Sequence, residues 1–352
     1  MLLIYGANGY TGRLIVDECV RRGLRPIIAA RRADALAELA EQYGLESRVF
    51  PLTSPDVLAS NLDGVRVVLH AAGPFFRTSA AMVTACLVRQ VHYLDVTGEI
   101  VVFEACKARD AEARSRGIVV LPGVGFDVVP TDCLAAQLAT RLPDTSLLEL
   151  AFAGGGVFSR GTLKTMVLGL NDGGAVRQDG RITRVPTAWR TQRIAFRDRP
   201  RSGVTIPWGD VSTAHWSTGI PNIHTYIALP PDARKSLRMV GFVKPMLRLD
   251  LVRALVERLI DARVTGPSAE VRATARMHIW GRVTHLDGRV VSGTAETPEG
   301  YRLTALSAAE SAVRLLDAPP APGYHTPSTA FGADFLTTLP ECSMQLGDIT
   351  TP

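Results

Sequence analysis

Three glycines at positions 6, 9 and 12 lie in the turn GANGYTG, which follows the first apolar run of the chain. Glycine permits a tight turn and lets a pyrophosphate approach the N-terminus of the next helix, where free N–H groups and the helix dipole favour an anion. The spacing differs from the usual G-x-G-x-x-G, and a glycine-rich turn without a ligand is the alternative. Because a strand-like run precedes the turn and an amphipathic helix follows it, we predict a dinucleotide site with these contacts: Gly6, Asn8, Gly9, Tyr10, Thr11 and Gly12.

Two arginines, Arg31 and Arg32, end the second apolar run, 19 and 20 positions after Gly12. In dinucleotide-binding domains this place holds the group that contacts the adenosine ribose, and an acidic residue there selects NAD. No acid occurs here before Asp34. A guanidinium matches a phosphate bidentately, so the pair predicts NADP(H) as the cofactor. The alternative is a solvated pair that caps the loop before the second helix.

Six short apolar runs, separated mostly by segments of helical periodicity, must position these residues. Unalternated Val- and Ile-rich runs between helices are typical of a parallel sheet covered on both faces. We therefore predict an α/β fold with an N-terminal Rossmann-type domain whose strands lie at 2–5, 26–30, 48–52, 66–72, 92–96 and 117–123, and whose helices include 11–23, 33–44 and 103–117.

The second half of the chain has a different pattern. Residues 147–155 and 184–198 alternate enough to be strands, and 268–297 is typical of a long hairpin with a turn at Asp287–Gly288. Thr297 and Pro298 suit the N-cap and first position of a helix that runs to about Leu316. The pattern predicts a C-terminal α+β domain with a mixed or antiparallel sheet.

Three further segments, HAAGPF (70–75), HYLDVTGE (92–99) and LPGVGFDVVPTD (121–132), follow predicted strands. Together with GANGYTG they resemble the saccharopine dehydrogenase-like oxidoreductases, a family that includes trans-acting enoyl reductases. The resemblance is clear over residues 1–135, and GYHTPSTAFG (323–332) is similar to the family's closing segment. It implies an NADP-binding domain at 1–130 with 300–352 returning to pack on it, and a substrate and dimerisation domain at 131–299.

The resemblance also implies roles for these segments. Ala72, Gly73, Pro74 and Phe75 are expected beside the nicotinamide and its ribose. The other two segments are expected to line the cleft, with Thr97 and Gly98 at the cofactor and Glu99 and Phe126 at the substrate. The chain is shorter than true saccharopine reductases, and residues that would hold a lysine-derived amino acid cannot be placed on it.

Proton donors for hydride transfer are sought near the predicted nicotinamide, and the candidates are Tyr93, Asp95, Thr97, Glu99 and Asp127. Asp127 is the first choice, because it follows a G-x-G-F turn at the carboxyl end of a strand, where ligands of open α/β sheets bind. A carboxyl group in an apolar cleft can have its pKa raised enough to donate a proton. A capping or loop-tying role before Pro130 is the alternative for Asp127, and strand packing is the alternative for Tyr93.

Two segments of the second half are conspicuous. The stretch 206–222 is predicted as a loop whose Trp208 and His215 contact substrate, with plain tryptophan packing as the alternative. Residues 235–260 alternate basic and apolar side chains, which indicates an amphipathic helix pair in the core or at a dimer contact, or a lid over an apolar substrate.

Composition and motif content exclude several classes of protein. The formal charge of +5 is spread without a run of five like charges, which argues against nucleic-acid binding. The seven histidines lack metal-ligand spacing, and no tyrosine has lysine four residues later, as short-chain dehydrogenases require. The five scattered cysteines, the absence of a long apolar stretch and a first strand that begins at residue 2 predict a cytoplasmic protein with reduced thiols.

Two functions remain open. The first is an NADPH-dependent reductase that transfers hydride to a C=C or C=N bond of a small-molecule metabolite, acting as a homodimer. The second is a non-catalytic protein that binds NADP(H) as a redox-sensing or scaffold ligand. The loop at 206–222 and the turn that carries Asp127 favour the enzyme.

Overall fold

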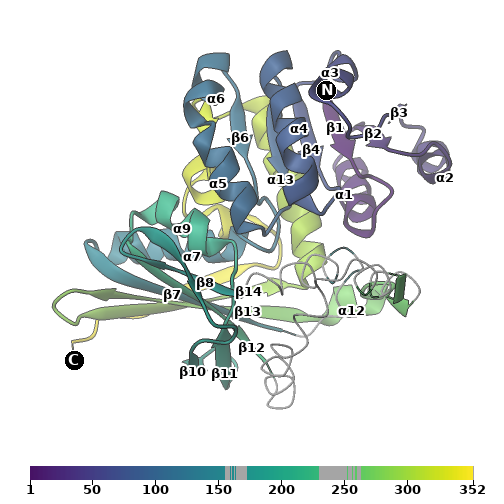
Figure 1. Ribbon diagram of the computed structural model, residues 1–352. Helices are drawn as coiled ribbons and strands as arrows, with labels where there is room; N and C mark the ends of the chain where they lie inside the picture. The colour runs from purple at the N-terminus through teal and green to yellow at the C-terminus, as the bar shows by residue number, and fades with distance from the viewer. Residues whose placement is uncertain are drawn as a thin grey trace. The chain divides into compact units, whose positions relative to one another are not determined.

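The computed structural model describes residues 1–154, 173–229 and 263–351, with a few single positions between these ranges (Figure 1). The chain forms two compact units. The first comprises Met1–Val129 and Tyr301–Phe335, and the second comprises Pro130–Gly300 and Leu336–Pro352. The predicted segment 235–260 lies outside the described residues, apart from single positions.

The first unit is built on a parallel sheet of seven strands in the order β15-β6-β5-β4-β1-β2-β3. Each of the six strands predicted for residues 2–123 is present, and the two-residue β15 is added from the C-terminal part of the chain. The strands are β1 Leu2–Tyr5, β2 Ile27–Ala30, β3 Ser47–Val49, β4 Val67–His70, β5 His92–Asp95, β6 Val119–Leu121 and β15 Gly323–Tyr324. This arrangement confirms the predicted Rossmann-type sheet.

Helices cover both faces of this sheet (Figure 1). Side chains such as Leu3 and Tyr5 pack toward α3 Pro55–Ser60, α4 Phe75–Arg89, α5 Ile100–Ala108 and α6 Asp110–Arg116. Leu2 and Ile4, one residue out of phase, pack toward α1 Tyr10–Arg21, α2 Asp34–Tyr43 and α13 Gly300–Asp317. Alternate residues of a strand point to opposite faces, so strands covered on both sides are apolar throughout. The predicted helix at 103–117 is two helices, α5 and α6.

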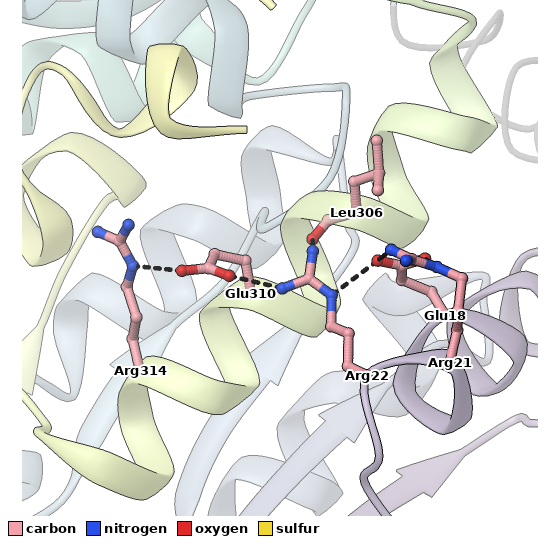
Figure 2. A network of polar contacts seen from close by, with 6 residues as sticks. All are labelled: Glu18, Arg21, Arg22, Leu306, Glu310 and Arg314. Atoms are coloured by element: carbon pink, nitrogen blue, oxygen red, sulfur yellow. Dashed lines mark hydrogen bonds and ion pairs between the residues drawn. The ribbon is translucent and has the colours of Figure 1, made fainter. Parts of the chain in front are cut away.

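The helix α13 joins the first unit although almost 180 residues separate it from β6. Its apolar face, which includes Ala308, Ala312 and Leu315, belongs to the same buried cluster as Ile15 and Cys19 of α1. Figure 2 shows the polar contact that accompanies this packing.

Arg22, at the end of α1, lies between carboxylates of two helices. Its guanidinium donates to Glu18 at 2.7 Å and to Glu310 of α13 at 2.5 Å, and it also reaches the carbonyl of Leu306 (Figure 2). Its side chain is 19% exposed, so the pair is only weakly screened by water. Arg21 binds the same Glu18 but is 64% exposed. Arg22 is thus the residue that ties the returning helix to α1.

The second unit contains a mixed sheet in the order β10-β11-β12-β7-β13-β14-β16, with β8 also paired to β12 and β9 paired to β8. The contact between β12 and β7 is parallel, and the other pairs are antiparallel. The strands are β7 Thr145–Ala153, β8 Gly174–Gln178, β9 Arg181–Val185, β10 Thr191–Ala195, β11 Pro200–Thr205, β12 Asn222–Ala228, β13 Arg276–His285, β14 Val290–Pro298 and β16 Ser343–Leu346. The predicted hairpin and the predicted mixed sheet are confirmed.

Among the described residues the second unit includes the helices α7 Val129–Arg141, whose first residue closes the first unit, α9 Asp210–Thr218 and α12 Ala269–Thr274. The stretch 206–222, predicted as a loop, contains α9, so that prediction is wrong. Asp210 lies in the first turn of α9, and Gly219, with φ of +74°, ends it in the left-handed conformation. Both features are typical helix boundaries, and the turn-rich flanks obscured them in the sequence.

Two boundaries in the C-terminal part differ from the prediction. Thr297 and Pro298 are the last residues of β14, and the following helix α13 begins at Gly300. The prediction that all of 300–352 packs on the first domain is wrong for 336–352, because β16 pairs with β14 of the second unit. The backbone partners of an edge strand, which the sequence does not reveal, decide where that segment lies. Within the described ranges, no helix is long and apolar enough to cross a membrane.

The position of Arg22 predicts a difference in local stability. Arg22→Met should free α13 and speed hydrogen exchange of its amides about 30-fold, equivalent to about 2 kcal/mol, since it leaves Glu310 and Glu18 without their shared partner. Arg21→Met is the matched control and should change exchange less than threefold, because that arginine is largely exposed. Equal effects of the two substitutions would contradict the assigned role of Arg22.

Candidate functional site

The carboxyl ends of the parallel strands bring five loops to one edge of the first sheet. These loops are the glycine turn after β1, the arginines after β2, and the segments after β4, β5 and β6. In open α/β sheets ligands bind at this edge. The predicted cofactor and catalytic residues of the first unit therefore lie in this edge or directly beneath it.

The glycine turn forms a cradle with no room for side chains. Gly6 has a φ of +85°, and a Cβ atom there would lie 2.9 Å from Ala71 and Ala72 after β4. A Cβ atom at Gly12 would lie 2.1 Å from the carbonyl oxygen of Gly6. The first turn of α1 contains no acidic residue, and its N-cap, Gly9, provides no side chain. The N-terminus of this 12-residue helix therefore has neither a capping side chain nor an acidic residue of its own, which fits binding of the pyrophosphate of a dinucleotide there.

Arg31 and Arg32 are both exposed, directly after the last residue of β2. Arg32 lies 3.5 Å from the carboxylate of Asp34. Arg31 has no ion pair among the residues that the structure describes. Two arginines at this place could hold the 2′-phosphate of NADP(H), and Arg31 is the one whose charge is not already matched.

Asp95, at the end of β5, is completely buried and joins three backbone segments. Its carboxylate accepts hydrogen bonds from the Tyr93 hydroxyl at 2.7 Å, the Thr97 amide at 3.0 Å and the Gly123 amide at 2.9 Å. Burial raises the pKa of Asp95 to about 6, although these hydrogen bonds favour the charged form. Tyr93 is equally buried. The hydrogen bonds of Asp95 and Tyr93 are thus made to other groups of the protein. This is the arrangement expected of side chains that position the loops after β5 and β6.

Glu99 lies at the N-terminus of α4, a helix whose own N-cap, Pro74, has no capping side chain. Its two carboxylate oxygens accept hydrogen bonds from the amides of Phe75 and Phe76, each at 2.8 Å. A carboxylate from another loop thus satisfies the orphan amides of the helix. Burial raises the pKa of Glu99, despite these two bonds. Glu99 is a predicted substrate contact. In the structure its carboxylate also holds the amide of Phe75, the last residue of the segment Ala72–Phe75.

Asp127 lies in the turn after β6 with its carboxyl group against the backbone of the loop after β5. A Cβ atom at Gly98 would be 2.5 Å from Asp127 Oδ2, so only glycine leaves room for the carboxyl group there. Asp127 keeps part of its surface in contact with solvent. Burial of the carboxyl group, with a smaller effect from the negative charge of Glu99, raises the pKa of Asp127 to about 7. The Asp127 carboxyl group is therefore protonated in a substantial fraction of the molecules near neutral pH.

The loop of Ala72, Gly73 and Pro74 is held from below by His70 and Thr78. The Thr78 hydroxyl donates to the carbonyl of Ala72 at 2.9 Å, with Pro74 O at 3.3 Å, and lies 2.9 Å from His70 Nε2. Because the hydroxyl proton is used on a carbonyl, His70 must donate through Nε2. Burial lowers the pKa of His70 to about 3, so the ring stays neutral.

Residues of α13 support the same edge, and the sequence offered no signal for them. The Thr304 hydroxyl accepts a hydrogen bond from the amide of Phe126 at 3.0 Å, and Ser307 donates to the carbonyl of Val124 at 2.7 Å. The ring of Tyr301 meets that of Tyr10 edge-on, with centroids 5.1 Å apart. The helix α13, whose Thr304 lies 178 positions beyond Phe126, therefore positions both the glycine turn and the turn that carries Asp127.

Trp208 and His215, the two predicted substrate contacts of the second half, belong to the second unit. The Trp208 ring packs on Phe152, with centroids 4.7 Å apart. His215 Nδ1 lies 3.0 Å from the carbonyl of Ile220, and its ring touches Trp216. These contacts are typical of side chains that pack around a helix such as α9. Across the described ranges, no cluster of three His, Cys, Asp or Glu residues could hold a metal ion.

Comparisons with known proteins agree with this geometry. Residues 2–121 match the family model of the saccharopine dehydrogenase NADP binding domain. The trans-acting enoyl reductase of Mycobacterium leprae is 25% identical, with 98% of this chain and 97% of that protein aligned. The lipid droplet localized protein of Caenorhabditis elegans is 24% identical, with 94% and 93% aligned.

Solved structures show the same fold. The apo saccharopine dehydrogenase (L-Glu forming) of Saccharomyces cerevisiae superposes with a TM-score of 0.67 at 10% identity and covers 99% of both chains. The homospermidine synthase of Legionella pneumophila in complex with NAD has a TM-score of 0.64 at 12% identity and covers 99% of this chain and 91% of its own. The predicted resemblance, fold and NADP cofactor are confirmed, and the family model together with the names of the relatives indicates an oxidoreductase.

The contact between Thr304 and Phe126 can be tested without an assay of activity. Thr304→Val keeps the shape of the side chain but removes the acceptor, so the Phe126 amide should exchange with solvent about tenfold faster. Thr304→Ser keeps the acceptor and is the control, for which exchange should stay within twofold of wild type. Unchanged exchange in Thr304→Val would show that α13 does not hold this turn.

Proposed function

We propose that this chain, which carries a saccharopine dehydrogenase NADP-binding domain at residues 2–121, is an NADPH-dependent reductase of a conjugated C=C bond in a small-molecule metabolite or biosynthetic intermediate. The observation that carries the proposal is Asp127, a residue of intermediate exposure at the cofactor edge of the sheet, whose carboxyl group has its pKa raised by burial to about 7. The names of relatives such as the trans-acting enoyl reductase of M. leprae support C=C reduction over reduction of an imine.

The cofactor would be held by groups of the first unit alone. The amides of the first turn of α1 and the glycine turn would bind the pyrophosphate, and Arg31 with Arg32 would bind the 2′-phosphate. Ala72–Phe75, Thr97 and Gly98 would border the nicotinamide and its ribose. When bound, NADPH supplies the hydride.

Proton delivery distinguishes the two reductions. An iminium is already protonated at nitrogen, so its reduction needs no acid from the protein. Reduction of a conjugated C=C bond puts hydride on the β-carbon and leaves a negative charge on the carbonyl oxygen, and the α-carbon then takes a proton. Asp127 can hold that proton at neutral pH because burial and Glu99 keep it on the carboxyl group. Asp95 and Tyr93 serve as positioning groups in this scheme, since both are buried and bonded to one another.

The reductase and the non-catalytic alternative differ in one measurement. NADPH oxidation should accelerate when α,β-unsaturated thioesters or ketones are added, and much less with imines. Tight NADPH binding without oxidation by any of these classes would instead favour the redox-sensing or scaffold protein. We also propose a cytoplasmic homodimer, to be tested by native mass spectrometry and by fractionation of cells, with lipid droplets as the alternative location that the name of the C. elegans relative suggests.

Arg31 should determine cofactor selectivity. Arg31→Ala is expected to weaken NADPH binding about 100-fold and NADH binding less than threefold, since only NADPH carries the 2′-phosphate. Arg32→Ala should have a smaller effect because Asp34 already balances that charge. Titration of each cofactor by nicotinamide fluorescence checks this, and equal losses for NADPH and NADH would contradict the assignment.

Asp127 and Glu99 should set the pH dependence. If Asp127 donates a proton, kcat/KM falls as pH rises through about 7, because only the protonated form is active. Asp127→Asn should lower kcat at least 100-fold with cofactor affinity nearly unchanged. Glu99→Gln removes a negative charge that raises the pKa of Asp127, so the fall in kcat/KM should move to lower pH. A profile unchanged in Glu99→Gln would argue against this pair.

A further inference from the structure

One face of the second sheet carries a polar row across three neighbouring strands. Arg282 of β13 and His224 of β12 both lie in register with Glu149 of β7, which runs between them. Since directly paired residues share a face, the three side chains stand side by side, and Tyr226, two residues beyond His224, stands on the same face. Polar side chains in the middle of a sheet need partners when they are buried.

Glu149 has its partners within the row. It is 5% exposed and accepts hydrogen bonds from Arg282 at 2.9 and 2.5 Å and from the Tyr226 hydroxyl at 3.2 Å. The charge of Glu149 is therefore balanced by Arg282, whose side chain is 39% exposed.

His224 lacks such partners. It is 5% exposed, and its Nδ1 is buried without a hydrogen-bond partner among the residues that the structure describes. Burial, and to a smaller extent the charge of Arg190, lowers the pKa of His224, so the ring is neutral at pH 7 and one nitrogen carries a proton. An orphaned polar atom of this kind in a native protein indicates a group that completes it, such as water or a ligand.

An arginine without a counterion lies beside this histidine. The His224 ring meets the Trp189 ring edge-on, with centroids 5.6 Å apart, and the Arg190 guanidinium stacks on the Trp189 ring at 4.2 Å. Arg190 is exposed and has no ion pair within the described ranges. Gln192 lies two residues further along on the same face, and its Nε2 is also buried without a partner in the described part of the chain.

We propose that the side chains of His224, Trp189 and Arg190 together bind the carboxylate or phosphate group of an organic ligand. Arg190 supplies the positive charge, the imidazole N–H supplies a directed hydrogen bond, and the indole of Trp189 packs against both groups. The His224 imidazole stands beside Glu149 and Tyr226. The hydrogen bonds that Glu149 accepts from Arg282 and Tyr226 fix these neighbouring side chains.

This site goes beyond the proposed reductase, because every residue in it belongs to the second unit, whereas the cofactor groups named above belong to the first. If the reductase assignment also holds, the site selects substrates that carry an acid group in addition to the unsaturated bond. That last step rests on the proposed function, whereas binding of the anion does not.

The test observes His224 directly and uses no assay of turnover. The full-length protein is labelled with ¹⁵N-histidine, and His224→Gln assigns the ring signals among the seven histidines. Glutarate and inorganic phosphate are then titrated separately, so that the two arms distinguish a carboxylate site from a phosphate site. We expect at least one probe to shift the His224 ring nitrogens saturably, with a dissociation constant in the millimolar range or below.

Two substitutions separate a built site from general attraction to a basic protein. Arg190→Gln should weaken the titration of His224 at least tenfold. Arg193→Gln is the matched control, because Arg193 is exposed one residue out of phase with Gln192 on β10, and it should change binding less than twofold.

Three results would overturn the proposal. They are no saturable shift with either probe, equal weakening in Arg190→Gln and Arg193→Gln, and a His224 signal that moves with protein concentration instead of with probe. The last would show that a second copy of the chain covers this face. Because NADPH is absent from the titration, each result is independent of whether the chain proves to be a reductase.

Discussion

The candidate site depends on the buried carboxylate of Asp95. Parallel strands deliver their loops to one edge of the sheet, but the loops still have to be held against one another, and their amides have no strand partners there. Asp95 accepts the amides of Thr97 and Gly123 and thereby joins the loop after β5 to the loop after β6. Glu99 and Asp127 follow directly in these two loops. The hydrogen bonds of Asp95 therefore help to fix the positions of both residues relative to the sheet.

The three carboxyl groups of this edge differ through their surroundings. Asp95 has three donors and no solvent contact, and Glu99 has two helix amides. Burial, with a smaller effect from the charge of Glu99, raises the pKa of the Asp127 carboxyl group to about 7, above the value of about 6 at Asp95. Asp127 and Glu99 both keep part of their surface in contact with solvent, whereas Asp95 does not. Acid chemistry in proteins is commonly assigned by such differences between neighbouring titratable groups.

Buried polar side chains in each unit are only partly satisfied by hydrogen bonds. In the first unit the Thr78 hydroxyl under the edge donates to the carbonyl of Ala72, whereas Nδ1 of the neighbouring His70 is buried without a hydrogen-bond partner among the described residues. In the second unit a row of polar side chains crosses the sheet. Glu149 has hydrogen-bond partners within this row, whereas Nδ1 of His224 has none among the described residues. A row that is only partly satisfied is costly unless a ligand or water completes it, which is the physical basis for inferring an anion site there.

The sequence by itself determined the parallel sheet, the glycine cradle and the cofactor, because these depend on local patterns. Apolar runs of the right length, Gly6 and Gly12 at a strand–helix junction, and Arg31 after β2 are all visible without the fold. The tertiary structure decided what Thr304 and Arg22 do, because their partners, Phe126 and Glu310, are separated from them by 178 and 288 positions along the chain. It also decided that residues 210–218 form a helix, that residues 336–352 join the second sheet, and that Arg282, Glu149 and His224 stand in one row. Strand register and the packing of distant helices set these contacts, and neither leaves a local pattern that the sequence could display.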